Sequence, residues 1–165
     1  MAENQDSTSV SNDLHVVLVE PDIPWNTGNV GRTCLACDAQ LHLVRPLGFR
    51  LDAKYLKRAG LDYWQHVHPK VWSSWTELED QLPELGDPWF FSAEGERNLW
   101  QVDLQPRTVL VFGRETAGLP TSVREKHRER LISLPMAPGP VRSLNLSTSV
   151  GIALYEARRR LGFVG

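Results

Sequence analysis

The sequence predicts one α/β domain in which a mostly parallel sheet is flanked by helices. Three observations support this prediction. The chain has 165 residues, 41% of them hydrophobic, which is enough for one domain with a full core. Short apolar runs typical of buried strands alternate with segments in which apolar residues recur at helical spacing. This alternation is typical of parallel strands joined by helices that cover both faces of a sheet.

Strands are expected where short apolar or aromatic runs occur, at residues 15–20, 41–44, 65–72, 89–92, 108–113 and 131–134. The clearest of them is TVLVFG, the run that starts at Thr108. Helices are expected between and after the strands, beginning near residues 27–29, spanning 52–60 and 74–83, beginning near 120, and covering 146–161. Ser74 and Glu77 form a capping box for the third helix. The last helix carries one continuous apolar stripe.

The first thirteen residues are polar and carry net negative charge. Residues 1–13 are therefore expected to be a disordered tail, and residues 14–165 the folded domain. The tail lacks the basic and apolar regions of a secretory signal. No apolar run approaches the roughly 20 residues that span a membrane. We expect a cytoplasmic protein that makes no membrane contact.

The net charge of −2 is unusual for a protein that coats itself in nucleic acid, because phosphate binding normally requires a basic surface. Any contact with RNA would therefore come from local clusters. Two basic clusters qualify, namely Arg45, Arg50, Lys54, Lys57 and Arg58, and the run Arg158, Arg159 and Arg160. Charge alone favours solvated surface for both clusters.

Cys34 and Cys37 form a Cys-x-x-Cys pair, but the chain has no further cysteines to complete a zinc site. They lie in the apolar stripe of a helix, so two buried thiols are expected in place of a redox pair. His66 and His68 would share one face of a strand, as metal ligands could. No carboxylate pattern accompanies them, and no metal is expected.

In open parallel sheets, ligands bind beyond the carboxyl ends of the strands, so the loops after residues 92, 113 and 134 form the candidate site. The second loop, GRETAGLP, starts at Gly113, where glycine lets the backbone approach a ligand closely. Its charged residues Arg114 and Glu115 favour a site over a plain turn. The loop is neither a dinucleotide fingerprint nor a P-loop, so nicotinamide cofactors and nucleoside triphosphates are disfavoured.

Two further segments combine small polar residues with a helix start. The loop PMAPGP, residues 135–140, is stiffened by three prolines and precedes Ser143 and Asn145. The turn NTGNVGR, residues 26–32, offers two side-chain amides and one guanidinium. The alternative for each is a capped helix start, and each segment taken alone leaves both interpretations open.

Together these segments resemble the three motifs of the SPOUT superfamily, in its TrmH-like branch of RNA ribose 2′-O-methyltransferases. The first motif is residues 26–32, the second is VFGRETAGLP at 111–120, and the third is LPMAPGPVRSLNLS at 134–147. The resemblance extends from about residue 15 to the C-terminus. The stretches EPDIPWNTGN, RAGLDYW and YEARR make the chain similar to the minimal TrmL (YibK-type) family, whose members methylate the wobble ribose of certain tRNAs.

The resemblance implies a deep trefoil knot in the C-terminal third, S-adenosyl-L-methionine as the cofactor bound in the knot, a tRNA substrate and an obligate homodimer. It places five residues beside the cofactor, namely Phe91, Gly113, Leu134, Ser143 and Asn145. An apolar wall would accept the adenine while backbone groups bond its edge.

By the same resemblance, Arg32 occupies the proposed catalytic position. Arginine is effectively always protonated in proteins, so a charged Arg32 would clamp a phosphate or stabilise the developing alkoxide. Asn26 and Glu115 would orient the ribose or complete the pocket. Arg114 and Tyr155 would contact the substrate, and packing at a dimer interface is the alternative for Tyr155.

Three alternatives to wobble methylation follow from the sequence. The first is ribose methylation elsewhere in tRNA or in rRNA, since nothing in the chain indicates how a base would be recognised. The second is a module that binds cofactor or RNA without turnover, which the complete set of motif residues disfavours. The third is a nucleotide-binding Rossmann enzyme, which the missing glycine fingerprint disfavours.

Overall fold

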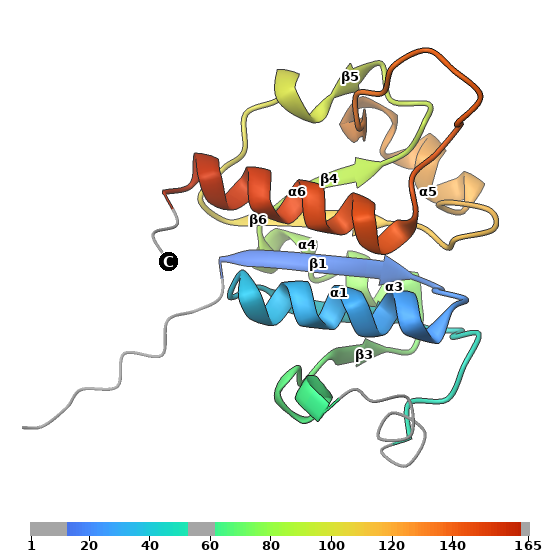
Figure 1. Ribbon diagram of the computed structural model, residues 1–165, viewed down its shortest axis with the longest axis vertical. Helices are drawn as coiled ribbons and strands as arrows, with labels where there is room; N and C mark the ends of the chain where they lie inside the picture. The colour runs from blue at the N-terminus through green and yellow to red at the C-terminus, as the bar shows by residue number, and fades with distance from the viewer. Residues whose placement is uncertain (1–12, 53–61, 163–165) are drawn as a thin grey trace, which may run out of the picture.

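The computed structural model describes residues 13–52 and 62–162, in which the strands form one seven-stranded sheet (Figure 1). The strand order is β3-β2-β1-β6-β4-β7-β5, and neighbouring strands run parallel. The strands are β1 (Leu14–Val19), β2 (Gln40–Val44), β3 (Lys70–Trp72), β4 (Asp87–Phe91), β5 (Arg97–Asn98), β6 (Thr108–Phe112) and β7 (Leu131–Ser133). The predicted α/β class with a parallel sheet is confirmed.

Helices cover both faces of this sheet. The long helices α1 (Pro24–Ala36) and α6 (Leu146–Arg160) lie side by side on one face, blue and red in Figure 1. The other face is covered by α3 (Trp75–Glu79), α4 (Leu82–Leu85) and α5 (Thr121–Lys126). Three short 3-10 helices complete the described elements, namely η1 (Asp62–His66), η2 (Leu99–Gln101) and η3 (Arg128–Arg130).

The central strand β1 shows how the sheet separates two hydrophobic cores. All six of its residues are buried, because β1 pairs on both sides and both of its faces are covered. Val16 and Leu18 belong to the core that contains residues of α1 and α6. Val17 and Val19 belong to the core beneath α3, α4 and α5. The period of two along the strand therefore supplies both cores.

Helix α1 begins at Pro24, earlier than the start predicted near residues 27–29. Proline suits the first turn of a helix, because the N–H that it lacks would have no partner within the helix. The residue before it, Ile23, has no side chain that could cap the helix. Asn26 consequently lies inside the first turn and is not the helix cap.

The strand predicted at residues 65–72 was wrong for most of its length, because only its last three residues are a strand. Residues 62–66 form the 3-10 helix η1. His66 ends that helix, and His68 has a positive φ of 45°, so the two histidines do not share a strand face.

The helix predicted from Ser74 to Pro83 is divided into α3 and α4. Ser74 caps α3 as predicted, accepting a hydrogen bond from the Glu77 N–H at 3.3 Å. The Glu77 carboxylate accepts from the N–H of Ser73 at 2.7 Å, one residue before the donor of a standard capping box. Pro83 lies in the first turn of α4, where proline is tolerated, and does not end a helix.

Cys34 and Cys37 are free and buried, as predicted. Cys34 lies in α1, and Cys37 is its C-cap. Burial raises the pKa of both thiols, which keeps them protonated and unreactive.

Several predictions lie outside the described residues. They are the tail up to residue 12, most of the helix expected at 52–60, and the basic residues Lys54, Lys57 and Arg58. The trefoil knot implied by the resemblance stays a prediction.

Candidate functional site

The three predicted loops leave neighbouring strands, since β6, β4 and β7 are adjacent in the parallel sheet. The loops therefore start at one edge of the sheet. At this edge the rings of Phe91 and Phe112 stack, with centroids 4.3 Å apart and planes 8° from parallel. Phe91 and Leu134 are half-buried and pack against the core beneath α1 and α6. The edge thus offers an apolar wall beside the ends of three strands.

Glu115, in the loop after β6, joins that loop to the start of α1. Its Oε2 accepts a hydrogen bond from the Asp22 N–H at 2.7 Å. Its Oε1 accepts from the Ile23 N–H at 3.2 Å and from the Asn26 side-chain amide at 3.1 Å. A helix N-terminus has unpaired donors and favours negative charge. Glu115 therefore supplies the cap that Ile23 cannot provide.

Asn145 extends these contacts to the start of α6. Its Nδ2 donates to Oδ1 of Asn26 at 3.0 Å. Its own Oδ1 accepts from the N–H groups of Ser147 and Thr148 at 2.9 and 3.3 Å, so Asn145 is the N-cap of α6. One residue from each motif thus enters a single chain of hydrogen bonds, here called the Asn26–Glu115–Asn145 network.

Gly113 is required by the loop that it begins. A Cβ at this position would lie 2.0 Å from the carbonyl carbon of Gly118 and 2.1 Å from the nitrogen of Leu119. The loop closes on itself through two backbone hydrogen bonds between Arg114 and Gly118, of 3.2 and 2.9 Å. The packing of the loop therefore requires glycine at this position, whether or not a ligand approaches the backbone.

Arg114, predicted to contact substrate, forms an ion pair with Glu20 in which Nη2 and Oε2 are 2.5 Å apart. The two side chains are 31% and 28% exposed. Nearby, the Thr116 hydroxyl donates to the Asp22 carboxylate at 2.7 Å. Both contacts join the loop after β6 to the segment between β1 and α1. Arg114 therefore helps to hold these two segments together, and its charge is balanced by that of Glu20.

Arg32 lies apart from this network, exposed on α1. Its guanidinium carbon is 4.6 Å from the centre of the Tyr63 ring. The Tyr63 hydroxyl donates to the carbonyl of Gly28 at 2.8 Å. Tyr63 is a residue of this region to which the sequence analysis gave no role. The available signal was its place in the RAGLDYW stretch, which resembled the family without suggesting a function.

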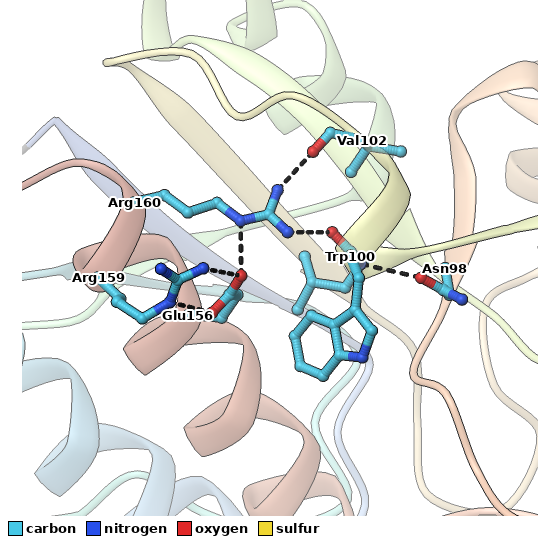
Figure 2. A network of polar contacts seen from close by, with 7 residues as sticks. Asn98, Trp100, Val102, Glu156, Arg159 and Arg160 are labelled. Atoms are coloured by element: carbon cyan, nitrogen blue, oxygen red, sulfur yellow. Dashed lines mark hydrogen bonds and ion pairs between the residues drawn. The ribbon is translucent and has the colours of Figure 1, made fainter.

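The arginines at the end of α6, considered above as RNA contacts, mainly join the helix to the rest of the domain. Arg160 bonds Glu156 at 2.6 Å and donates to the Val102 carbonyl at 2.5 Å (Figure 2). Arg158 donates to two backbone carbonyls just after α1. Arg159 is 72% exposed and pairs with Glu156. The hydrogen bonds that Arg159 donates lower the pKa of Glu156 to about 2. The run is therefore not a free basic patch.

Ser143 and Tyr155 are exposed and lie outside the Asn26–Glu115–Asn145 network. Ser143 belongs to the segment 135–145 between β7 and α6, which is exposed throughout. The loop after β4 also borders a cavity of about 700 Å³, whose lining includes Glu94 and Leu131 and not the predicted cofactor residues.

Within residues 13–52 and 62–162, no three His, Cys, Asp or Glu side chains gather as ligands for a metal ion. In the same part of the chain, no helix has the length and apolar character needed to cross a membrane.

Comparisons with known proteins identify relatives with the same fold. The SpoU rRNA Methylase family matches residues 13–155. A tRNA (cytidine(34)-2′-O)-methyltransferase from Polaromonas sp. is 43% identical over 154 residues, which cover 92% of this chain and 93% of the relative. A solved structure concerned with 2-OH methylation of cytidine or uridine 34 on tRNA has a TM-score of 0.82 and 48% identity, covering 90% of this chain and 96% of that one. The SpoU methyltransferase AviRb from Streptomyces viridochromogenes, solved in complex with AdoMet, has a TM-score of 0.76 and 25% identity, covering 97% of this chain and 62% of that one.

Proposed function

The chain belongs to the SpoU rRNA methylase family, and from that premise we propose that it methylates the ribose 2′-hydroxyl of the wobble nucleotide of tRNA. Two of the proteins named above support this activity and this position, namely the Polaromonas methyltransferase and the solved structure concerned with cytidine or uridine 34 of tRNA. The Asn26–Glu115–Asn145 network carries the proposal, because it joins the three motifs at the carboxyl edge of the sheet. An enzyme acting on tRNA in this way would work in the cytoplasm.

The residues at this edge fit S-adenosyl-L-methionine, the donor found in the related AviRb complex. Phe91 and Leu134 offer half-buried apolar surface, which suits the adenine ring. The backbone that follows β6 and β7, at Gly113 and Leu134, would hydrogen-bond the edge of the base. Asn145 would complete the pocket from the start of α6, with Ser143 on the preceding loop. The bound cofactor would supply an electrophilic methyl group carried on a sulfonium.

The hydrogen bonds of Asn26 and Glu115 support a pocket-building role for both. The Glu115 carboxylate accepts three hydrogen bonds, and Asn26 uses both its amide nitrogen and its amide oxygen. Asn26 is only 4% exposed. These residues would hold the loops in register while other groups meet the RNA.

Arg32 is the residue best suited to the reacting ribose. Its guanidinium is exposed on α1, and a charged guanidinium can bind a phosphate with two parallel hydrogen bonds or stabilise a developing alkoxide. The nucleophilic 2′-oxygen would form the new bond to the methyl carbon as the sulfur leaves, and the hydroxyl proton would pass to solvent. Holding the 2′-oxygen in line with the methyl group would supply much of the acceleration.

We further propose a homodimer. On the α1 and α6 face, Trp25 is 67% exposed, Leu35 39% and Tyr155 56%. A contiguous apolar surface is typical of a protein–protein interface, and the homodimer is proposed on the basis that these side chains contribute to one. A second copy of the chain would cover them and could bring its own site next to the same tRNA. Sedimentation equilibrium would test this, since a monomer at micromolar concentration would contradict it.

The activity is tested by incubation with labelled S-adenosyl-L-methionine and total tRNA, followed by mass-spectrometric mapping of the methyl group. A ribose methyl at position 34 is expected. Transfer to a base, or no transfer, would overturn the proposal, whereas a ribose methyl elsewhere would overturn only the position. Arg32→Lys should lose activity because lysine cannot form the two-pronged contact. Arg128→Ala, an exposed arginine on η3, is the matched control.

A further inference from the structure

The 3-10 helix η1 packs across the middle of α1 through two aromatic residues. A Cβ at Gly31 would lie 2.7 Å from the ring of Trp64 and 3.2 Å from the side chain of Val67. Residue 31 must therefore remain small for η1 to lie this close. The close approach of Trp64 brings its neighbour, Tyr63, over the adjacent turn of α1.

Tyr63 makes two contacts with that turn. Its hydroxyl donates to the Gly28 carbonyl at 2.8 Å, and its ring lies 4.6 Å from the guanidinium carbon of Arg32. Gly28 and Arg32 are four residues apart, so in an α-helix the Gly28 carbonyl is also the acceptor for the Arg32 N–H. The hydroxyl thus fixes the ring to the backbone turn from which Arg32 projects.

This arrangement restricts an exposed side chain that would otherwise be free to move. An unrestrained arginine has large rotamer entropy, which is lost when it binds an anion. A cation–π contact uses none of the five N–H donors of the guanidinium, so it leaves them available for an oxygen ligand. Burial raises the pKa of Tyr63, so its hydroxyl remains a proton donor to Gly28 near neutral pH.

We propose that Tyr63 is a positioning residue that pre-orients Arg32 for the substrate RNA. The inference rests on the proposed function of Arg32 and adds a second residue, from a different segment, to the same step. Tyr63 acts through Arg32 and makes no contact with the reacting atoms itself.

A double-mutant cycle between Tyr63 and Arg32 tests the inference, with tRNA affinity and single-turnover methylation as separate readouts. Tyr63→Leu should lower both affinity and rate, together about twofold to fivefold, as expected for loss of one cation–π contact near the surface. Tyr63→Phe keeps the ring and should stay closer to wild type than Tyr63→Leu does. In an Arg32→Ala background, Tyr63→Leu should have no further effect.

S-adenosyl-L-methionine affinity, measured by calorimetry, is the folding control and should be unchanged in Tyr63→Leu. Equal losses from Tyr63→Leu in the wild-type and Arg32→Ala backgrounds would overturn the inference, because they would indicate a purely structural role. Wild-type affinity and rate in Tyr63→Leu would overturn it as well. Absence of methyl transfer by the wild-type protein would overturn the proposed function, and the coupling between Tyr63 and Arg32 could still be measured by tRNA affinity alone.

Discussion

Replacing Glu115 with alanine would leave three donors at the start of α1 without their acceptor. The N–H groups of Asp22 and Ile23 would lose contacts of 2.7 and 3.2 Å, and the Asn26 amide would lose one of 3.1 Å. Asp22 and Ile23 are half-buried, so water can replace part of what they lose. Asn26 is 4% exposed, which largely prevents that replacement.

The expected cost follows from these three contacts. A hydrogen bond to a charged group contributes about 1.5–3 kcal/mol, and a buried donor left unpaired costs a similar amount. Allowing for water at the two backbone donors, we expect Glu115→Ala to lower the free energy of unfolding by about 2–4 kcal/mol. For a domain of this size, that change corresponds to a fall in Tm of about 5–15 °C.

Urea unfolding and differential scanning calorimetry would measure the loss. Glu125→Ala, at an exposed position of α5, is the matched control and should stay within about 0.5 kcal/mol of wild type. Glu115→Gln keeps the shape and one acceptor oxygen, so its stability should fall between those of wild type and the alanine variant. If Glu115→Ala were as stable as the control, the carboxylate would not be the cap of α1 and the reasoning above would be refuted.

Three further outcomes can be measured on the same equipment. Burial lowers the pKa of His42 to about 3, so below about pH 6.5 the unfolded chain binds a proton that the folded chain does not. Stability should therefore fall between about pH 6.5 and 3, by at most about 1.4 kcal/mol per pH unit, and an unchanged slope in His42→Gln would contradict this. Gly113→Ala should lower the free energy of unfolding by about 3 kcal/mol or prevent folding, because backbone atoms lie 2.0 and 2.1 Å from the added carbon. The control Gly139→Ala adds its carbon in open space and should keep the wild-type Tm. Arg160→Ala should lower the free energy of unfolding by about 2–3 kcal/mol, because Arg160 loses its hydrogen bonds to two backbone carbonyls. Arg159→Ala should lower it by less than about 1 kcal/mol, because its ion pair is exposed. Equal losses in the two variants would contradict this assignment.

The parts of the fold that the sequence predicted are those in which local pattern and burial agree. β1 and β6 are mostly apolar runs, rich in valine and buried on both faces, so their position follows from the pattern alone. The start of α1 was misplaced because its cap, Glu115, comes from a loop about 90 residues later, which local pattern cannot show. The residues before β3 were predicted as a strand, with His66 and His68 on one face. They begin instead with the 3-10 helix η1, whose Trp64 packs against Gly31 of α1.

The candidate site shows a similar division. Resemblance identified Asn26, Glu115 and Asn145, and the structure brings all three into contact. The charged residues were harder to interpret, because a sequence does not reveal whether an acceptor lies within reach. Arg114 is paired with Glu20, and Arg160 is bonded to backbone carbonyls, so neither is the free cation that its position suggested.

The Asn26–Glu115–Asn145 network also determines when the site can form. Its two side-chain contacts join residues that are separated in the sequence by 89 and by 119 positions. Closing such long loops costs chain entropy before any contact offsets that cost. During synthesis, Asn26 leaves the ribosome before Glu115, and Asn145 is the last of the three. The pocket proposed for the methyl donor therefore needs residues from both ends of the domain, and the proposed activity requires that α6 has folded against α1.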